Sequence, residues 1–287
     1  MNIITIFNKF PTQKSCIEYL EKIKWSNKPT CPYCHSQKHH SYPKEHRHYC
    51  QSCKTSYRVT IGTIFHDTRL PLQKWFLAIA LILNAKKGIS SRQLARDIEV
   101  NKNTAWSMQM RIRKAMIDTP SLLSGIVEMD ETYVGGKPRK MNNSSVTLKR
   151  GRGTSKIPVV GMVERSGNVV AQKQKELKFK DLKKIAKKSI DFENTVLMTD
   201  DYKGYIPFKK LVNHQTINHS QKQYVDGNKH TNTIEGFWSL LKRGITGQYH
   251  YLSNKWLNKY ITEFCYKYNN RNNQNVFENL LINALGV

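Results

Sequence analysis

Apolar residues recur with helical spacing in several stretches of the chain. The clearest stretch is at residues 232–244, where Ile234, Phe237, Trp238 and Leu241 stand at i, i+3, i+4 and i+7, which predicts a helix with one buried face. The same spacing predicts further helices at residues 12–25, 72–83, 90–98, 104–116, 179–190 and 256–268, and a last helix through Leu285. Cys16 and Cys265 belong to these apolar stripes, so we expect both in the protein core.

Other stretches have the patterns of strands. In residues 125–134, Val127 and Met129 share one face, whereas Glu128 and Asp130 share the other. Residues 195–202 form an apolar run that ends in acids, as a buried central strand does when it reaches a sheet edge. Residues 157–164 and 169–172, separated by a Ser-Gly-Asn turn, predict a hairpin that continues the sheet. Periodicity alone therefore supports a mixed α/β class.

The charge of the chain indicates the kind of partner. Its 287 residues include 47 Lys and Arg against 21 Asp and Glu, a formal net charge of +26. Such an excess favours a polyanion, and nucleic acid is the first candidate. The sequence contains no lipidation motif, secretory leader or apolar span of bilayer length, so we expect a cytoplasmic, nucleoid-associated protein without a membrane partner.

Four cysteines form two C-x-x-C pairs, Cys31 with Cys34 and Cys50 with Cys53. Each tight turn lets two thiolates reach one tetrahedral ion, so the spacing predicts a structural zinc ribbon. Disulfides are the alternative, which a chain without a secretion signal disfavours. The nearby histidines could compete as ligands, but four thiolates complete the site, and we expect a solvated, partly basic finger tip. These histidines are His35, His39, His40, His46 and His48.

Residues 88–116 have the pattern of a helix-turn-helix. Ser90 or Ser91 caps a first helix, residues 99–101 form the turn, and the second helix carries Ala105 and Ile112 in phase. The second helix of such a motif enters the major groove of DNA. We expect base or phosphate contacts from Lys102, Asn103 and Thr104, and backbone contacts from Arg111, Arg113 and Lys114. An ordinary helical pair in a linker is the alternative.

Three acids stand where catalytic carboxylates could meet. Asp130 is on the polar face of a predicted strand, Asp200 ends another strand, and Glu235 lies on the predicted helix beside its apolar stripe. Each acid also has a purely structural explanation. Acids at strand ends are often only solvated, and Glu235 stands three residues after Asn232, which matches a capping box.

The order of these acids and the residues around them resemble a known family. A strand-borne Asp, a second Asp at a strand end and a helix-borne Glu form the D-D-E pattern of transposases and integrases with the ribonuclease-H-like fold. Met-Asp-Glu-Thr-Tyr-Val-Gly-Gly at 129–136, Thr-Asp-Asp-Tyr at 199–202 and residues 230–244 look like the transposases of one group of bacterial insertion sequences. In that group, a zinc ribbon precedes the catalytic domain, and residues 62–72 also resemble the segment after the ribbon.

The resemblance implies a mechanism and roles for residues. Two Mg²⁺ ions would be held by Asp130 as the shared ligand, with Asp200 on one ion and Glu235 on the other. Water would cut DNA at an element end, and the freed 3′-hydroxyl would attack target DNA. Two neighbouring acids could take the place of the assigned ones, Asp201 for Asp200 and Glu131 for Asp130. The family usually has its acid directly after the Thr, which favours Asp200. The strand alternation puts Asp130 on the polar face.

Further contacts with double-stranded DNA are expected on the polar segments. Residues 137–156 are rich in Lys, Arg, Gly, Ser and Asn, and we expect Arg150 and Arg152 to contact phosphates. A solvated segment without this role is the alternative. Lys242 and Arg243 could bind phosphates near Glu235, and Asn232 could orient that acid. Synapsis of two ends implies a homodimer or a higher assembly on DNA.

We therefore expect three domains and a single main function. Residues 1–62 would hold the N-terminal helix and zinc ribbon, residues 63–120 the helix-turn-helix region, and residues 121–287 a ribonuclease-H-like mixed-sheet catalytic domain with C-terminal helices. The expected function is that of a transposase that binds terminal inverted repeats, cuts and joins. The alternatives are a non-catalytic zinc-ribbon DNA-binding regulator and a metal-dependent nuclease that cuts without joining.

Overall fold

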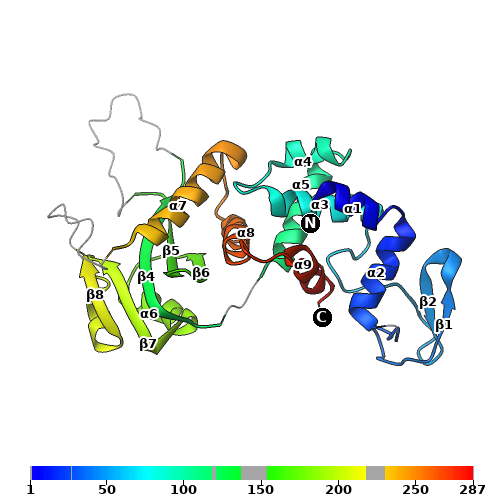
Figure 1. Cartoon of the computed structure of the whole chain (residues 1–287), viewed down its shortest axis with the longest axis horizontal. Helices are drawn as coiled ribbons and strands as arrows, with labels where there is room; N and C mark the ends of the chain where they lie inside the picture. Colours follow the sequence, from blue (N-terminus) through cyan, green and yellow to red (C-terminus); the bar gives the residue numbers. More distant parts are fainter. Residues whose placement is uncertain (1, 27, 118–120, 137–153, 218–229, 287) are drawn as a thin grey trace. The chain divides into compact units, whose positions relative to one another are not determined.

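The structure is a computed structural model that describes residues 2–26, 28–117, 121–136, 154–217 and 230–286. It divides the chain into two compact units (Figure 1). Unit 1 comprises Met1–Ile117 and Asn272–Val287, and unit 2 comprises Asp118–Arg271. Within the described residues, no helix is both long and apolar enough to cross a membrane. Arg150 and Arg152 lie outside the described residues.

Unit 1 consists of helices and a small sheet. Its helices are α1 (Ile3–Lys9), α2 (Gln13–Trp25), α3 (Leu72–Asn84), α4 (Ser91–Asp97), α5 (Lys102–Ala115) and α9 (Val276–Leu285). Thr12 caps α2 through a capping box with Ser15, and Pro71 precedes α3. Ser90 caps α4 and Asn101 caps α5, with Glu99 in the left-handed conformation in the turn between them. This helix pair has the predicted helix-turn-helix arrangement.

The last helix packs in unit 1, whereas the sequence analysis placed it in the third domain. Its Phe277 lies 6.5 Å from Phe10 and 5.9 Å from Phe76, measured between ring centroids. The Tyr19 hydroxyl also donates a hydrogen bond to Glu278. Local sequence patterns could not reveal this packing, because Phe10, Tyr19 and Phe76 stand about 200 or more positions before α9 in the sequence.

The zinc-ribbon region forms a three-stranded antiparallel sheet of β1 (His39–Tyr42), β2 (Arg47–Cys50) and β3 (Ser56–Tyr57), with a short 3-10 turn, η1 (Pro43–Glu45), at its tip. His48 departs from the expected solvated tip. It is buried between Trp25 and Tyr57, and its ring nitrogens contact Ser41 Oγ and Glu21 Oε1, each at 3.0 Å. The alternation of β2 turns this side chain toward α2.

Unit 2 is built on a five-stranded mixed sheet in the order β6-β5-β4-β7-β8. The strands β4, β5 and β6 are antiparallel neighbours, whereas β7 and β8 run parallel to β4. This arrangement is the expected ribonuclease-H-like sheet, preceded by the zinc ribbon. The strands are β4 (Leu123–Val134), β5 (Ile157–Glu164), β6 (Val169–Lys173), β7 (Ile190–Asp200) and β8 (Asn213–Ile217).

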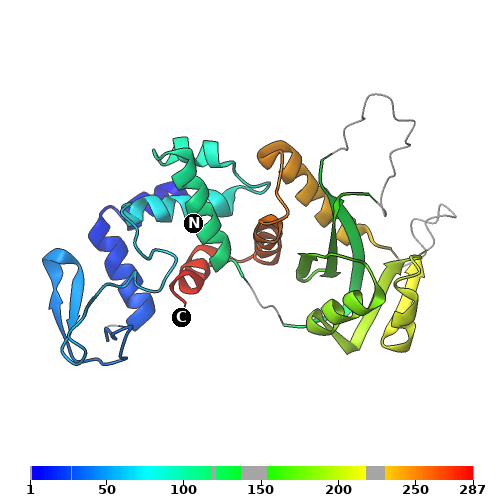
Figure 2. The same cartoon turned by 180° about the vertical axis from the view of Figure 1, so that it is seen from behind.

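Helices cover both faces of this sheet (Figures 1 and 2). On one face, α6 (Phe179–Ser189) packs with Val127, Met129 and the 3-10 helix η2 (Ile206–Lys210) in a buried core. On the other face, α7 (Asn232–Gly244) contacts β4 and β5, and α8 (Leu257–Asn269) contacts β6. A π-helical turn, η4 (Ile245–Tyr249), follows α7. Ile234, Phe237, Trp238 and Leu241 are buried, which confirms the predicted apolar face of α7.

Candidate active site

Asp130 and Asp200 lie at corresponding positions of the two central parallel strands. Glu128 of β4 pairs with Met198 of β7, so Asp130 and Asp200 each follow two residues further along. Side chains two residues apart point to the same face of a sheet. Asp200 Oδ1 also accepts the backbone N–H of Tyr202 at 3.1 Å. The fold therefore brings these two carboxylates together on the α7 face.

The electrostatic surroundings of Asp130 favour a cation. Burial raises the pKa of Asp130 to about 7, and the negative charges of Glu131 and Asp200 act in the same direction. A carboxylate with this pKa loses its proton more readily when a positive ion is near. The carboxylate oxygens of Asp130 are suitable ligands for a hard divalent ion such as Mg²⁺.

An indole from α7 contacts the same carboxylate. Trp238 Nε1 donates a hydrogen bond to Asp130 Oδ2 at 3.0 Å. Gly161, which pairs with Asp130 across β4 and β5, makes room for this ring. A Cβ at position 161 would lie 2.5 Å from Trp238 Cη2, closer than real Cβ atoms come. The missing side chain on β5 thus allows Trp238 to reach Asp130.

Glu131 faces the other side of the sheet. Its Oε2 accepts a hydrogen bond from the Tyr205 hydroxyl at 2.6 Å, and Tyr205 belongs to the core under α6. Burial and the nearby Glu131 raise the pKa of Tyr205 well above its ordinary value. The alternation of β4 thus separates Glu131 from the face that carries Asp130.

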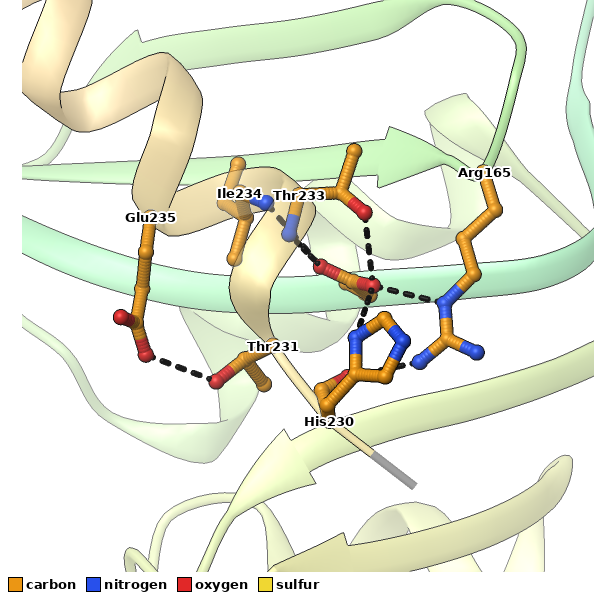
Figure 3. Close-up of polar contacts among 7 residues, drawn as sticks. Arg165, His230, Thr231, Thr233, Ile234 and Glu235 are labelled. Atoms are coloured by element: carbon orange, nitrogen blue, oxygen red, sulfur yellow. Dashed lines mark hydrogen bonds and ion pairs between the residues drawn. The ribbon is translucent and has the colours of Figure 1, made fainter. Parts of the chain in front are cut away.

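Glu235 extends from the solvent-exposed side of the first turns of α7. Its Oε1 accepts a hydrogen bond from Thr231 Oγ1 at 3.0 Å (Figure 3). Trp238, which contacts Asp130, follows it by one turn of the same helix. Among the described side chains, the group compact enough to hold one metal ion is formed by the four ribbon cysteines, and the three acids do not form such a group.

Sequence reasoning did not identify Glu128 as a site residue. This carboxylate is fully buried and accepts the backbone N–H groups of Thr233 and Ile234 at 2.8 and 3.0 Å (Figure 3). It also accepts from Thr233 Oγ1 at 3.0 Å and from Arg165 Nε at 2.7 Å. The signal that could have indicated it is its position on the same face as Asp130, two residues earlier, where a covering helix would bury it.

The hydrogen bonds from the start of α7 to Glu128 correct the interpretation that Asn232 and Glu235 form a capping box. Thr231, not Asn232, is the N-cap residue, and its side chain makes no capping bond to the helix backbone. The first free N–H groups of α7 are instead satisfied by Glu128, a residue of β4. A negative charge at this end of a helix is also favoured by the helix dipole.

The four ribbon cysteines come together as the sequence predicted. Cys31 Sγ lies 3.6 Å from Cys53 Sγ, Cys34 Sγ lies 3.5 Å from Cys50 Sγ, and all four sulfurs are within 4.8 Å of one another. Zinc–sulfur bonds of about 2.3 Å in a tetrahedron place sulfurs about 3.8 Å apart, so the site fits zinc. The sulfurs are too far apart for disulfides, whose bonds are about 2.05 Å long.

The expected DNA-contacting residues differ in their surroundings. Lys102 and Asn103 are exposed at the start of α5, and Thr104 is half-buried. Arg111 donates to the carbonyl of His66 at 2.5 Å and lies over the Trp75 ring, so its guanidinium contacts the protein itself. Arg113 is only 1% exposed, which corrects the expectation that it reaches a phosphate.

Near the end of α7, Lys242 and Arg243 are exposed. Arg243 donates to Ser239 Oγ at 2.6 Å, within the same helix. Asn232 is exposed in the first turn, near Glu235. These three side chains are accessible to solvent on α7, the helix that also carries Glu235.

Two protein families match parts of the chain. Residues 122–269, more than half of the chain, match the family described as the ISXO2-like transposase domain. The chain belongs to this transposase family. Residues 11–56 match the transposase zinc-ribbon domain. A relative from Halobacterium salinarum, an uncharacterized protein in the transposable element ISH50, is 28% identical over 254 residues, covering 83% of this chain and 84% of the relative.

Solved structures of the Mos1 transposase are also similar to the chain. The Mos1 strand transfer complex matches with a TM-score of 0.32 and 12% identity over 74% of this chain and 78% of that chain. A pre-cleavage Mos1 transpososome matches with a TM-score of 0.30 and 12% identity, covering 73% of this chain and 78% of that chain. Both the TM-scores and the sequence identities are low.

Proposed function

We propose that this transposase-family protein binds the terminal inverted repeats of an insertion sequence and catalyses Mg²⁺-dependent cleavage and joining of DNA. The observation that carries the proposal is the alignment of Asp130, within β4, with Asp200, at the end of the adjacent parallel strand β7, each two residues beyond the paired Glu128 and Met198. Two half-buried acids on neighbouring strands, with the pKa of Asp130 raised to about 7, are typical of a functional site that binds a cation.

The three acids would hold two Mg²⁺ ions, with Asp130 shared between them. The ions, when bound, supply positive charge that stabilises the developing negative charge on the phosphate and helps an attacking oxygen to lose its proton. The Trp238 N–H would keep Asp130 oriented, and Tyr202 would do the same for Asp200 through its backbone. Glu235 would turn from Thr231 toward the other two acids.

The reaction would proceed in two displacements at phosphorus. Water attacks the phosphodiester at the element end and the P–O3′ bond breaks, which leaves a 3′-hydroxyl on one side and a 5′-phosphate on the other. That 3′-hydroxyl then attacks a phosphodiester of target DNA and displaces another 3′-oxygen, so one bond forms as one breaks. No covalent bond between protein and DNA is involved.

Unit 1 would recognise the DNA ends. The exposed Lys102 and Asn103, with Thr104, stand at the start of the second helix of a helix-turn-helix, where base contacts are made in such motifs. The net charge of +26 supports extensive phosphate contact. Bringing two element ends together would require two copies of the chain on DNA. The ribbon, the helix-turn-helix region and the catalytic domain remain our proposed functional division.

A cleavage and joining assay tests the proposal. A duplex that carries the terminal inverted repeat flanking the gene is incubated with the protein and Mg²⁺ in the presence of a target plasmid. Nicked ends together with joined products support a transposase. Nicked ends that never join indicate a nuclease, and specific binding without nicking in Mg²⁺ or Mn²⁺ indicates a regulator.

A further inference from the structure

Glu128 joins the central strand of unit 2 to the helix that carries Glu235. Its carboxylate is fully buried, and its two oxygens accept hydrogen bonds from Thr233 and Ile234 at the N-terminus of α7, which are labelled in Figure 3. Oε2 accepts the N–H groups of Thr233 and Ile234, and Oε1 accepts from Thr233 Oγ1. A strand residue therefore supplies the N-terminal capping bonds of a helix that begins about 100 positions later.

Arg165 compensates the buried charge of Glu128, and the His230 ring lies beside the same carboxylate. Arg165 Nε donates to Glu128 Oε1 at 2.7 Å, while its Nη2 donates at 2.8 Å to the carbonyl of His230, just before α7. His230 Nδ1 lies 3.3 Å from the same Oε1. A carboxylate offers about four lone-pair positions, and the four hydrogen bonds from Thr233, Ile234 and Arg165 occupy them. Glu128 consequently has no oxygen left for a metal ion.

The helix is held to β4 at a second point. Trp238 donates to Asp130, two residues beyond Glu128 on the same face of the strand. Two strand residues span about 6.6 Å, and the five helical residues from Thr233 to Trp238 span about 7.5 Å. The two spacings are comparable, which allows both bonds to form at once. Glu235 lies between these two points of attachment.

We propose that Glu128 is a positioning residue, which fixes the first turn of α7 and thereby sets where Glu235 stands relative to Asp130 and Asp200. The proposal rests on the proposed function, because it assigns Glu235 to the metal site. It adds a residue outside the three acids, together with Arg165 as its partner. Supporting groups that orient metal ligands commonly change metal affinity 10- to 100-fold when they are removed.

The test measures metal binding and helix anchoring separately from DNA cleavage. Tb³⁺ binds to oxygen ligand sites, and its luminescence can be excited by a nearby indole such as Trp238. Hydrogen exchange at the amides of Thr233 and Ile234 reports the anchoring of α7. Both measurements are made on the whole zinc-loaded protein, for wild type, Glu128→Gln and Arg165→Gln, with Trp238→Phe to assign the luminescence.

Glu263→Gln is the matched control. Glu263 is another fully buried carboxylate of unit 2, and it pairs with Lys267 on α8, a helix that packs on the edge strand β6. Replacing it removes a buried charge that bonds with Lys267 of α8 and with Tyr249 of η4, residues outside α7 and β4. A general loss of stability would therefore affect Glu263→Gln and Glu128→Gln alike.

We expect Glu128→Gln to weaken Tb³⁺ binding about tenfold or more and to speed exchange at Thr233 and Ile234, while Glu263→Gln binds Tb³⁺ like wild type. Equal Tb³⁺ affinities in Glu128→Gln and wild type would overturn the proposal, and so would equal losses in both glutamine variants. The proposed function would survive either result, provided that wild type binds Tb³⁺ and cuts DNA.

Arg165→Gln distinguishes a Glu128 that positions α7 from a Glu128 that binds the metal ion directly. It also replaces Glu128→Gln in the test if that variant does not fold. Loss of the arginine loosens Glu128, so we expect weaker Tb³⁺ binding and faster exchange in the first turn of α7. If Glu128 were itself a ligand, removing the neighbouring cation would leave Tb³⁺ binding unchanged or strengthen it, which would overturn the proposal. Wild type that binds no Tb³⁺ would contradict the proposed function, and the same result would overturn the positioning role of Glu128, which depends on a metal site at Glu235.

Discussion

Trp238 of α7 donates its indole N–H to Asp130 of β4 at 3.0 Å, so the helix that carries one proposed metal ligand directly holds another. This bond lowers the pKa of Asp130 against the larger effect of burial, which raises it. The indole therefore both orients the carboxylate and favours its charged form. The account makes five predictions.

Trp238→Phe should slow DNA cleavage while leaving the fold intact. The ring remains large enough to pack, but Asp130 loses a hydrogen bond worth about 1.5–3 kcal/mol to a charged acceptor, so we expect at least about a tenfold lower rate. Because the lost bond favoured the charged form, the pH at which activity appears should rise. Single-turnover cleavage measured against pH checks this. An unchanged rate and profile would show that the bond has no part in catalysis.

Gly161→Ala should disturb the hydrogen bond between Trp238 and Asp130 by displacing the Trp238 ring. The added methyl group would stand 2.5 Å from Trp238 Cη2 and push the ring away, which we expect to cost about 1–3 kcal/mol of unfolding free energy and to slow cleavage. Gly236→Ala is the control, since a Cβ there meets nothing within 4 Å and alanine favours a helix. Urea denaturation of both variants is the measurement. Equal stabilities would contradict the crowding at position 161.

Without Mg²⁺, Asp130 should make the protein less stable as the pH rises. Burial raises the folded-state pKa of Asp130 to about 7 from an ordinary 3.8, so the folded state binds the proton more tightly than the unfolded state. Its contribution to stability is complete below about pH 4 and is lost as the pH rises through about 7. Denaturation at pH 5 and pH 8 should show a larger fall for wild type than for Asp130→Asn. Parallel curves would contradict the raised pKa.

Zinc binding should depend on the ribbon cysteines and not on the buried one. Cys34→Ser removes one of four thiolates that lie within 4.8 Å of one another, so we expect the bound zinc to fall from about one ion per chain toward none. Cys16→Ala is the control, because Cys16 is fully buried in the core, where burial raises its pKa to about 12. Elemental analysis of both purified variants decides this. Equal zinc content in the two variants would argue against the site.

Local patterns predicted the elements that carry the proposed site. The apolar spacing on α7 and the alternation of β4 follow from single faces packing on a core, so Ile234, Trp238 and Met129 are buried as predicted. The same alternation placed Asp130 apart from Glu131. The structure agrees, because Glu131 bonds with Tyr205 on the opposite face.

Long-range pairings could not be read from local patterns. Glu128 caps α7 from more than 100 positions away, and the capping box at Asn232 looked complete within its own segment. Glu263 is buried with Lys267 although neither fits an apolar stripe. The short edge strand Asn213–Ile217 is too polar to show strand periodicity, and its place beside β7 depends on tertiary packing.

The most direct test of the central claim compares adjacent acids in one nicking assay. A duplex with the terminal repeat is incubated with Mg²⁺ and with wild type, Asp130→Asn, Asp200→Asn, Glu235→Gln or Asp201→Asn. Asp201 is exposed, whereas Asp200 contributes to the charge around Asp130, so only Asp201→Asn should nick DNA at a rate near that of wild type. End binding should persist in all variants. Wild-type nicking by Asp130→Asn, Asp200→Asn or Glu235→Gln would contradict the claim that these three acids form the site.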